Sequence, residues 1–381
     1  MPTQLDILAL EPFYGGMRRA MLDTVIRCSR HRWTLLKLPP RRMERRLSVA
    51  ANWFAEQLSR HWSGKLDLLF TSEAMNLGSL YRLVPALATP PSVVYFHDNQ
   101  LPDPQRIVTK AEKVSRGSIG STGQVVVAPP PDVNLELVNL NTATAATEIW
   151  FNSVYHLKTF LGRATNLVAR HPELSSHNPM LEVTRRAHVM APPIDMNIVP
   201  HVKATMKLPP RDSKAIFIET RDADMRLLNA ALSMLSSRNI NFRLITVGPV
   251  EDLSDQWPRR TISETDDLAH VAGLLEAGVV LSAKPGATCD HQIIRGLLAG
   301  CRPVLPDRGV YSELLPGSLH TQTLYPSSNA KGMADRLQEA MYSAYSWHPP
   351  DFRQTLSHFE AIAACKAFDE RLAGLAGQAM D

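Results

Sequence analysis

Cysteine is scarce in this chain. The 381 residues include only four, Cys28, Cys289, Cys301 and Cys365, and no two of them form a CxxC pair. Four widely spaced thiols are too few for a disulfide framework in a chain of this length. The sequence therefore excludes a disulfide-stabilised scaffold and favours a reducing compartment.

Long apolar runs and a secretory leader are also missing. No segment approaches the roughly 18 uninterrupted apolar residues that a membrane-spanning helix needs. The N-terminus places Asp6 inside its first apolar run, and it has neither the basic nor the cleavable apolar region of a signal peptide. We therefore expect a soluble, cytoplasmic protein with no membrane partner.

The excess of charge of one sign is small. Lys and Arg total 41, Asp and Glu total 37, and the formal net charge is +4. Any contact with nucleic acid must therefore come from a local basic patch. Hydrophobic residues make up 44% of the chain, which is enough to fill two cores at roughly 150 residues a domain and excludes a disordered chain.

Short apolar runs alternate with helix-like spacings along the whole chain. The runs are 5–10, 34–38, 66–71, 92–97, 148–152, 187–190, 215–219, 241–248, 279–283 and 302–305. Strands that alternate with helices predict parallel sheets joined by right-handed crossovers. The fold class that we predict is α/β, with two doubly wound, Rossmann-like halves.

Proline-containing segments mark the joint between the halves, at 192–195 or in the polar stretch 200–214. We place an N-terminal domain at 1–195 and a C-terminal domain at 196–381. A segment rich in Gly, Ser and Pro, at about 102–133, is not suited to a regular core element and predicts a long mobile loop.

Residues beyond the carboxyl ends of parallel strands are the first candidates for a ligand site. Gly15 and Gly16 open a helix and can approach a phosphate, although a tight turn needs glycines as well. The run His97-Asp98-Asn99-Gln100 leaves a buried strand and offers groups that donate, accept or titrate. A hydrogen-bonded core histidine followed by turn residues is the alternative.

Basic residues supply further candidates. Four arginines, whose guanidinium groups suit phosphates, follow the second run: Arg41, Arg42, Arg45 and Arg46. Cations that could neutralise a diphosphate follow strands of the second half: Arg221, Arg226 and Lys284. A solvated surface is the alternative for both groups. Cys289-Asp290-His291 lacks a second ligand pair, so we expect no zinc.

Five segments of the first half occur in a characteristic order. They are Glu11-Pro12-Phe13-Tyr14-Gly15-Gly16, Leu38-Pro39 with the arginines that follow, Thr71-Ser72, Tyr95 to Leu101, and Phe151-Asn152-Ser153-Val154-Tyr155-His156 leading to Phe160-Leu161. Together they resemble the N-terminal domain of the tRNA-queuosine alpha-mannosyltransferases over about the first 195 residues. Motifs of four to seven residues in register are far more specific than a glycine pair.

The resemblance implies a retaining GT-B glycosyltransferase, a hexosyltransferase with two Rossmann-like domains facing across a cleft. Its co-substrate would be GDP-mannose, its acceptor the cyclopentenediol of queuosine in a tRNA anticodon, and it would need no further cofactor and no metal. The implied catalytic residues are His97 and Asp98. The resemblance places Gly15 and Gly16 by the donor phosphates, and the other donor-binding candidates, taken from the residues of the second half, are Arg221, Arg226, Lys284 and Asp290. The acceptor side would comprise Glu11, Tyr14, Asn99, Gln100, Asn152 and Ser153, and Arg41, Arg42, Arg45 and Arg46 would bind RNA.

The second half departs from the family pattern. Where the family has His-Arg-Trp-Glu, this chain has Glu219-Thr220-Arg221-Asp222, and neither of two donor-binding glutamates spaced eight apart is present between Lys284 and Arg295. Asp290 could replace one of them. Two alternatives therefore stay open: a glycosyltransferase with a different donor or acceptor, and a non-catalytic tRNA-binding relative without a donor site.

Overall fold

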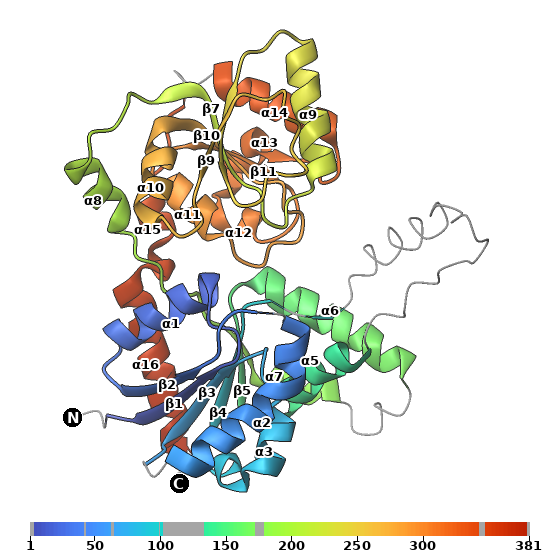
Figure 1. The fold of residues 1–381 in the computed structure, drawn as a ribbon, viewed down its shortest axis with the longest axis vertical. Coiled ribbons are helices and arrows are strands. Elements are labelled where there is room, and N and C mark those ends of the chain that lie inside the picture. The colour runs from blue at the N-terminus through green and yellow to red at the C-terminus, as the bar shows by residue number, and fades with distance from the viewer. Residues whose placement is uncertain are drawn as a thin grey trace. The chain divides into compact units, whose positions relative to one another are not determined.

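The computed structural model describes residues 4–41, 43–61, 65–98, 100–101, 133–171, 179–342 and 347–378. The chain divides into two compact units. Unit 1 comprises Met1–Ala191 and Cys365–Asp381, and unit 2 comprises Pro192–Ala364. Each unit is a parallel six-stranded sheet flanked by helices (Figure 1). Sequence analysis predicts a loop at about 102–133, and residues 102–132 of it lie outside the described residues.

The sheet of unit 1 has the strand order β2-β1-β3-β4-β5-β6. Its strands are β1 (Asp6–Glu11), β2 (Arg32–Lys37), β3 (Leu68–Ser72), β4 (Ser92–Phe96), β5 (Glu148–Phe151) and β6 (Ala187–Val189). Its helices are α1 (Gly16–Cys28), α2 (Met43–His61), α3 (Leu77–Leu83), α5 (Val133–Ala145), α6 (Val154–Arg170), α7 (Pro179–Arg186) and most of α16 (Ala361–Gln378), with a 3-10 turn at Pro85–Ala88. The apolar runs predict each strand to within two residues at either end.

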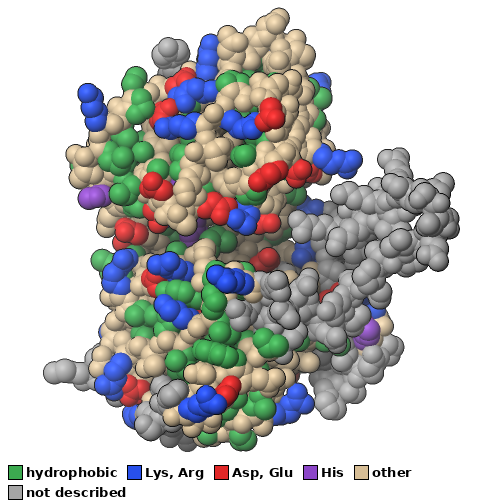
Figure 2. Space-filling model, in the orientation of Figure 1, with side chains coloured by type: hydrophobic (Ala, Val, Ile, Leu, Met, Phe, Trp, Pro, Cys, Tyr) green, Lys and Arg blue, Asp and Glu red, His purple; other side chains and the backbone are tan. Residues whose placement is uncertain are grey.

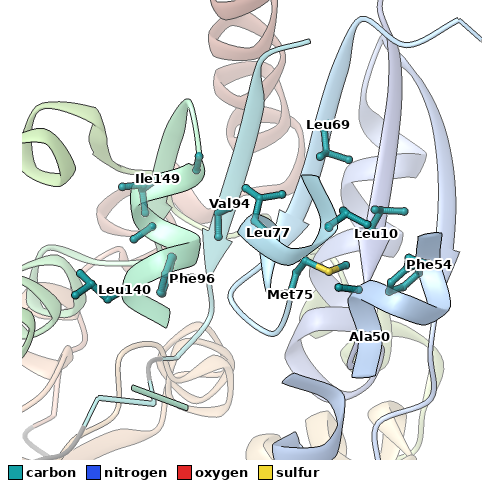
Figure 3. Close-up of a cluster of buried hydrophobic side chains, with 14 of the residues drawn as sticks. Leu10, Ala50, Phe54, Leu69, Met75, Leu77, Val94, Phe96, Leu140 and Ile149 are labelled. Carbon is teal, nitrogen blue, oxygen red and sulfur yellow. The ribbon is translucent and has the colours of Figure 1, made fainter. Parts of the chain in front are cut away.

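Alternating strand residues divide the core of unit 1 into two layers. Leu10 and Val94 face a layer that includes Phe54 of α2, Leu77 of α3 and Leu140 of α5 (Figure 3). On the opposite face, other strand residues pack against α1 and α16. Because both faces are covered by helices, the buried strands β1, β3, β4 and β5 are largely continuous apolar runs, whereas the edge strand β2 alternates between exposed and partly buried residues.

The sheet of unit 2 has the strand order β12-β11-β10-β7-β8-β9. Its strands are β7 (Asp212–Glu219), β8 (Arg243–Val247), β9 (Arg259–Ile262), β10 (Ala277–Leu281), β11 (Arg302–Pro306) and β12 (Leu324–Tyr325). Its helices are α8 (Ile198–Thr205), α9 (Met225–Ser237), α10 (Asp267–Glu276), α11 (His291–Leu298), α12 (Tyr311–Leu314), α13 (His320–Thr323), α14 (Ala330–Tyr342) and α15 (Phe352–Thr355), with 3-10 turns at Gly317–Leu319 and Ser357–Phe359. If the six strands are numbered 1 to 6 along the chain, their order in the sheet is 3-2-1-4-5-6, which is the order of a Rossmann sheet.

The C-terminal segment differs from the predicted division of the chain. Sequence analysis assigns 196–381 to one domain, whereas residues 365–381 belong to unit 1. Asp369 of α16 accepts hydrogen bonds from Ser29 Oγ (2.5 Å) and from the backbone N–H of Arg30 (2.8 Å). Phe368 and Leu372 of the same helix are fully buried in the unit 1 core. These contacts fix the end of the chain to unit 1.

Two features are absent from the described residues. None of their helices is long and apolar enough to span a bilayer. The same residues contain no group of three or more His, Cys, Asp or Glu side chains that could hold a metal ion.

Candidate functional site

Each sheet has one point at which the strand order reverses. In unit 1 it lies between β1 and β3, and in unit 2 between β7 and β10. Loops that follow the two strands at such a point leave the sheet toward opposite faces, and open α/β sheets bind ligands in the crevice between them. Glu11 ends β1, and Gly15 and Gly16 follow it, at the first point, and Lys284 follows β10 at the second. His97 and Asn152, by contrast, follow the next strands of the unit 1 sheet, β4 and β5.

The loop after β1 is shaped by a buried carboxyl group and two glycines. Glu11 ends the strand with 2% of its surface exposed, and its Oε1 accepts the N–H of Phe13 at 2.7 Å. Burial raises the pKa of Glu11 to about 7, although Arg18 opposes the shift. Gly16 has a φ of +53°, and a Cβ on Gly15 would overlap the ring of Pro40. The turn itself therefore requires both glycines.

A buried ion pair joins this loop to the next one. Arg18 of α1 contacts the carboxylate of Glu73, the first residue after β3. The same carboxylate accepts the backbone N–H groups of His97 (3.1 Å) and Asp98 (3.2 Å), which follow β4. Sequence analysis missed both Arg18 and Glu73. The available signal was the position of Glu73, an acidic residue placed directly after a buried strand.

The loops after β4 and β5 are also bonded to each other. The backbone C=O of His97 accepts Asn152 Nδ2 at 3.0 Å, and Asn152 Oδ1 contacts His156 Nδ1 at 2.9 Å. Ser153 caps α6 by accepting the N–H of His156 at 3.1 Å. Burial lowers the pKa of His156 to about 3, so this imidazole is neutral at physiological pH. The Asn152 and Ser153 side chains thus have local structural partners.

The remaining acceptor-side candidates lie around this assembly. The backbone N–H of Gln100 donates to Asn139 Oδ1 at 2.7 Å, and Asp98 is exposed. Tyr14 donates its hydroxyl to Asp23, and burial together with that carboxylate raises the pKa of Tyr14 to about 12. Asn99 lies outside the described residues.

Of the four predicted RNA-binding arginines, only Arg41 has a described side chain, and it is exposed. Arg42 lies outside the described residues, as do the side chains of Arg45 and Arg46 in α2. On the face drawn in Figure 2, Lys and Arg side chains are interspersed with Asp and Glu. The described part of that face therefore does not present a large field of one sign.

The second cluster lies in unit 2, at the carboxyl ends of β7 and β10. Lys284 Nζ forms an ion pair with the carboxylate of Glu219, which is the last residue of β7. Asp290 caps α11 by accepting the N–H of Ile293 at 3.2 Å, and its Oδ2 accepts the hydroxyl of Tyr311 at 3.1 Å. Burial disfavours the charge of Lys284, but Asp290 and Glu219 outweigh it and raise the pKa of this amine.

A small pocket lies among these residues, lined in part by Glu219, Lys284, Asp290 and Gln292. It has both a cation and carboxylates on its wall, at the reversal point of the sheet. These groups can bind an anion and hydroxyl groups, but in this structure the lining side chains leave almost no open volume between them, so a ligand would have to displace their mutual contacts.

The other predicted donor-side residues of unit 2 are placed differently. Arg221 contacts both carboxylate oxygens of Glu264, at 2.6 and 2.5 Å, and this hydrogen bonding raises the pKa of the guanidinium. Arg226 is exposed on α9. Arg295, which stands near the position of the second family glutamate, forms an ion pair with Asp267 at 2.8 Å. The structure thus gives Arg221 and Lys284 carboxylate partners, which the sequence alone did not predict.

Comparisons with known proteins agree with this architecture. Residues 6–194 match the family model described as tRNA-queuosine alpha-mannosyltransferase N-terminal. The chain is 24% identical to a Drosophila melanogaster tRNA-queuosine alpha-mannosyltransferase over 348 residues, which cover 85% of this chain and 84% of the relative.

Solved structures match over nearly the whole chain. Anabaena HepE in complex with UDP and glucose has a TM-score of 0.59 at 12% identity, covering 97% of this chain and 100% of that one. The catalytic domain of Arabidopsis thaliana starch synthase IV, bound to ADP and acarbose, has a TM-score of 0.64 at 8% identity and covers 99% of both chains. At such identities the match establishes the fold alone, which confirms the two predicted Rossmann-like domains. The chain is therefore a GT-B glycosyltransferase related to tRNA-queuosine alpha-mannosyltransferase, and its residues 6–194 belong to the family named for the N-terminal region of that enzyme.

Proposed function

We propose that this protein transfers mannose, with retention of configuration, from GDP-mannose to queuosine in a tRNA anticodon. The proposal depends on one observation above all. Two family motifs that are far apart in the sequence meet at the carboxyl end of the unit 1 sheet, where Asn152 bonds to the backbone of His97, and Glu73 bonds to the same residue. The Drosophila relative is named for the same activity.

Unit 1 would supply the acceptor side and His97. The hydroxyl oxygen of the acceptor forms a bond to the anomeric carbon on the face that the diphosphate leaves. The bond from that carbon to the diphosphate oxygen breaks, and this oxygen accepts the hydroxyl proton. The products are GDP and the mannosylated nucleoside, and no protein nucleophile is required. The protein contributes positioning and electrostatic stabilisation.

Unit 2 would bind the donor at the pocket beside Lys284. The leaving diphosphate needs cations, and Lys284 and Arg221 are the candidates on this edge of the sheet. Each would exchange its carboxylate partner for a phosphate oxygen. The freed carboxylate of Glu219 could then accept a hydrogen bond from a donor hydroxyl, a role that the family gives to the glutamates missing here.

A second candidate function is a tRNA-binding protein that does not bind a nucleotide sugar. The observation in its favour is the pairing of Lys284 with Glu219 and of Arg221 with Glu264, because it leaves less net positive charge for a diphosphate. A donor other than GDP-mannose is consistent with the same observation.

Thermal denaturation with nucleotides separates these functions, because a ligand that binds only the folded state raises its Tm. The ligands are GDP, UDP and ADP and their mannose, glucose and galactose conjugates. We expect a higher Tm with GDP and GDP-mannose, abolished by Lys284→Gln. Arg243→Gln is the matched control. Arg243 is the first residue of β8, so it lies at the amino ends of the strands, away from Lys284, and it is also ion-paired, with Asp212 at 2.7 Å. A shift with UDP alone would indicate another donor, and no shift with any nucleotide would favour the tRNA-binding function.

A further inference from the structure

Glu73 occupies a position that neither the sequence motifs nor the comparisons assign to the reaction. It follows β3 directly, and only 1% of its surface is exposed. A buried carboxylate is costly unless its oxygens are hydrogen-bonded and its charge is balanced. The contacts of Glu73 therefore indicate what holds it there.

Both carboxylate oxygens of Glu73 contact the turn after β4. Oε2 accepts the N–H of His97 at 3.1 Å, and Oε1 accepts the N–H of Asp98 at 3.2 Å. Two successive backbone N–H groups form a concave site for an anion, and the Glu73 carboxylate fills it. These bonds hold the two successive peptide groups on either side of the His97 Cα.

The main chain of Glu73 is itself fixed on both sides. Its N–H donates to the C=O of Tyr95 at 3.3 Å, and its C=O accepts Asn139 Nδ2 at 3.2 Å. Arg18 forms an ion pair with the carboxylate and balances its charge. Glu73 is therefore a fixed support for the turn and not a mobile side chain.

The C=O of His97 is held as well, by Asn152 Nδ2 at 3.0 Å. The N–H and the C=O of one residue are thus bonded to two buried side chains that come from different loops. The imidazole of His97 lies against the ring of Tyr95, with 4.7 Å between the ring centroids. Contacts with Glu73, Asn152 and Tyr95 thus hold both the backbone and the imidazole of His97.

We propose that Glu73 is a positioning residue for the transfer reaction: its carboxylate sets the His97–Asp98 turn in the orientation in which His97 meets the reacting sugar. This inference rests on the proposed function. It adds a residue that touches neither substrate and acts through the backbone of the catalytic turn. Loss of the carboxylate should lower kcat and leave the KM for the nucleotide sugar unchanged.

The test combines hydrogen exchange with kinetics in the full-length protein. In Glu73→Gln the amides of His97 and Asp98 should exchange at least about tenfold faster than in the wild type, because an amide group replaces one of the two acceptor oxygens. The kcat should fall by at least about tenfold. The double variant Arg18→Met with Glu73→Gln avoids an unpaired buried guanidinium, so it tests the same two readouts if the single variant unfolds.

Glu148→Gln is the matched control. Glu148 is a buried glutamate at the amino end of β5, bonded to Arg371 at 2.6 and 2.9 Å, so its loss also removes the carboxylate of an ion pair of unit 1, one whose arginine is partly exposed. It should leave the exchange of His97 and the kcat unchanged. Unchanged exchange in the Glu73 variants would overturn the inference, and so would faster exchange with unchanged kcat. A wild type that transfers no sugar would refute the proposed function separately, and the exchange data would still decide whether Glu73 fixes the turn.

Discussion

Replacing Glu11 by glutamine should stabilise unit 1 at alkaline pH and leave its stability nearly unchanged at acidic pH. The Glu11 side chain is almost fully buried at the end of β1, and burial raises its pKa to about 7. Glutamine has the same shape as the protonated acid and keeps an oxygen that can accept the N–H of Phe13. The variant therefore removes the charge and little else.

The size of the effect follows from the pKa. The folded-state value of about 7 lies above the ordinary value of 4.5 by about 2.5, and each pKa unit corresponds to about 1.4 kcal/mol. Between these pH values the folded chain holds a proton that the unfolded chain has lost. The stability that this proton contributes is complete below pH 4.5 and is lost as the pH rises through 7. At pH 9 the ionised Glu11 should cost roughly 3 kcal/mol, which Glu11→Gln should restore.

Thermal unfolding at pH 5 and pH 9 measures this difference. For a unit of about 200 residues, roughly 3 kcal/mol raises the Tm by about 6–12 °C. Glu56→Gln removes a carboxylate from the exposed face of α2, where it pairs with Arg60 at 2.5 Å, and it should change stability by less than about 1 kcal/mol at either pH. A Glu11→Gln protein that is less stable than the wild type at pH 9, or equally stabilised at both pH values, would refute the assignment of the raised pKa to burial.

Three further predictions follow from the same geometry. His97→Ala should lower the turnover by more than about tenfold, and because the imidazole is only 5% exposed and lies against Tyr95, it should also lower the Tm; steady-state rates and a melting curve measure both, and unchanged turnover of a folded variant would contradict the role. Gly15→Ala should destabilise unit 1 by about 1–3 kcal/mol, because the added Cβ would overlap a proline ring, whereas Gly162→Ala, in the middle of α6 with open space around it, should stabilise it by about 0.4–1 kcal/mol; equal shifts in denaturation midpoint would contradict the steric argument. Replacing Arg41 and Arg42 together by alanine should weaken tRNA binding and flatten its salt dependence, and an unchanged salt slope would identify this segment as a solvated surface.

The strands could be predicted from the sequence because most of them are buried on both faces. Continuous apolar runs are typical of such strands, and they locate β1 to β5 closely. β9 and β12 could not be predicted in this way, because they lie at the edges of the unit 2 sheet. β9 reads Arg-Arg-Thr-Ile and β12 has only two residues, and neither contains an apolar run.

The sequence predicted the part of the site that gives a local signal and not the partners that are distant in the chain. A polar run directly after a buried strand is a local signal, and it singled out His97. The partners of that residue are not local, since Glu73 precedes it by 24 positions and Asn152 follows it by 55. Only the order of the strands brings the three together, and a single sequence does not specify that order. The ion pair of Lys284 with Glu219 spans 65 positions and was missed for the same reason.

Transfer of mannose to tRNA can be measured directly with the purified protein. The purified protein would be incubated with GDP-mannose and a tRNA that contains queuosine, and the nucleosides would then be analysed by mass spectrometry after digestion. We expect that queuosine gains one hexose, that a tRNA with guanosine at this position gains none, and that His97→Ala abolishes most of the product. A tRNA and a nucleotide that both bind without any hexose transfer, or a hexose added to tRNA that lacks queuosine, would contradict the proposed function.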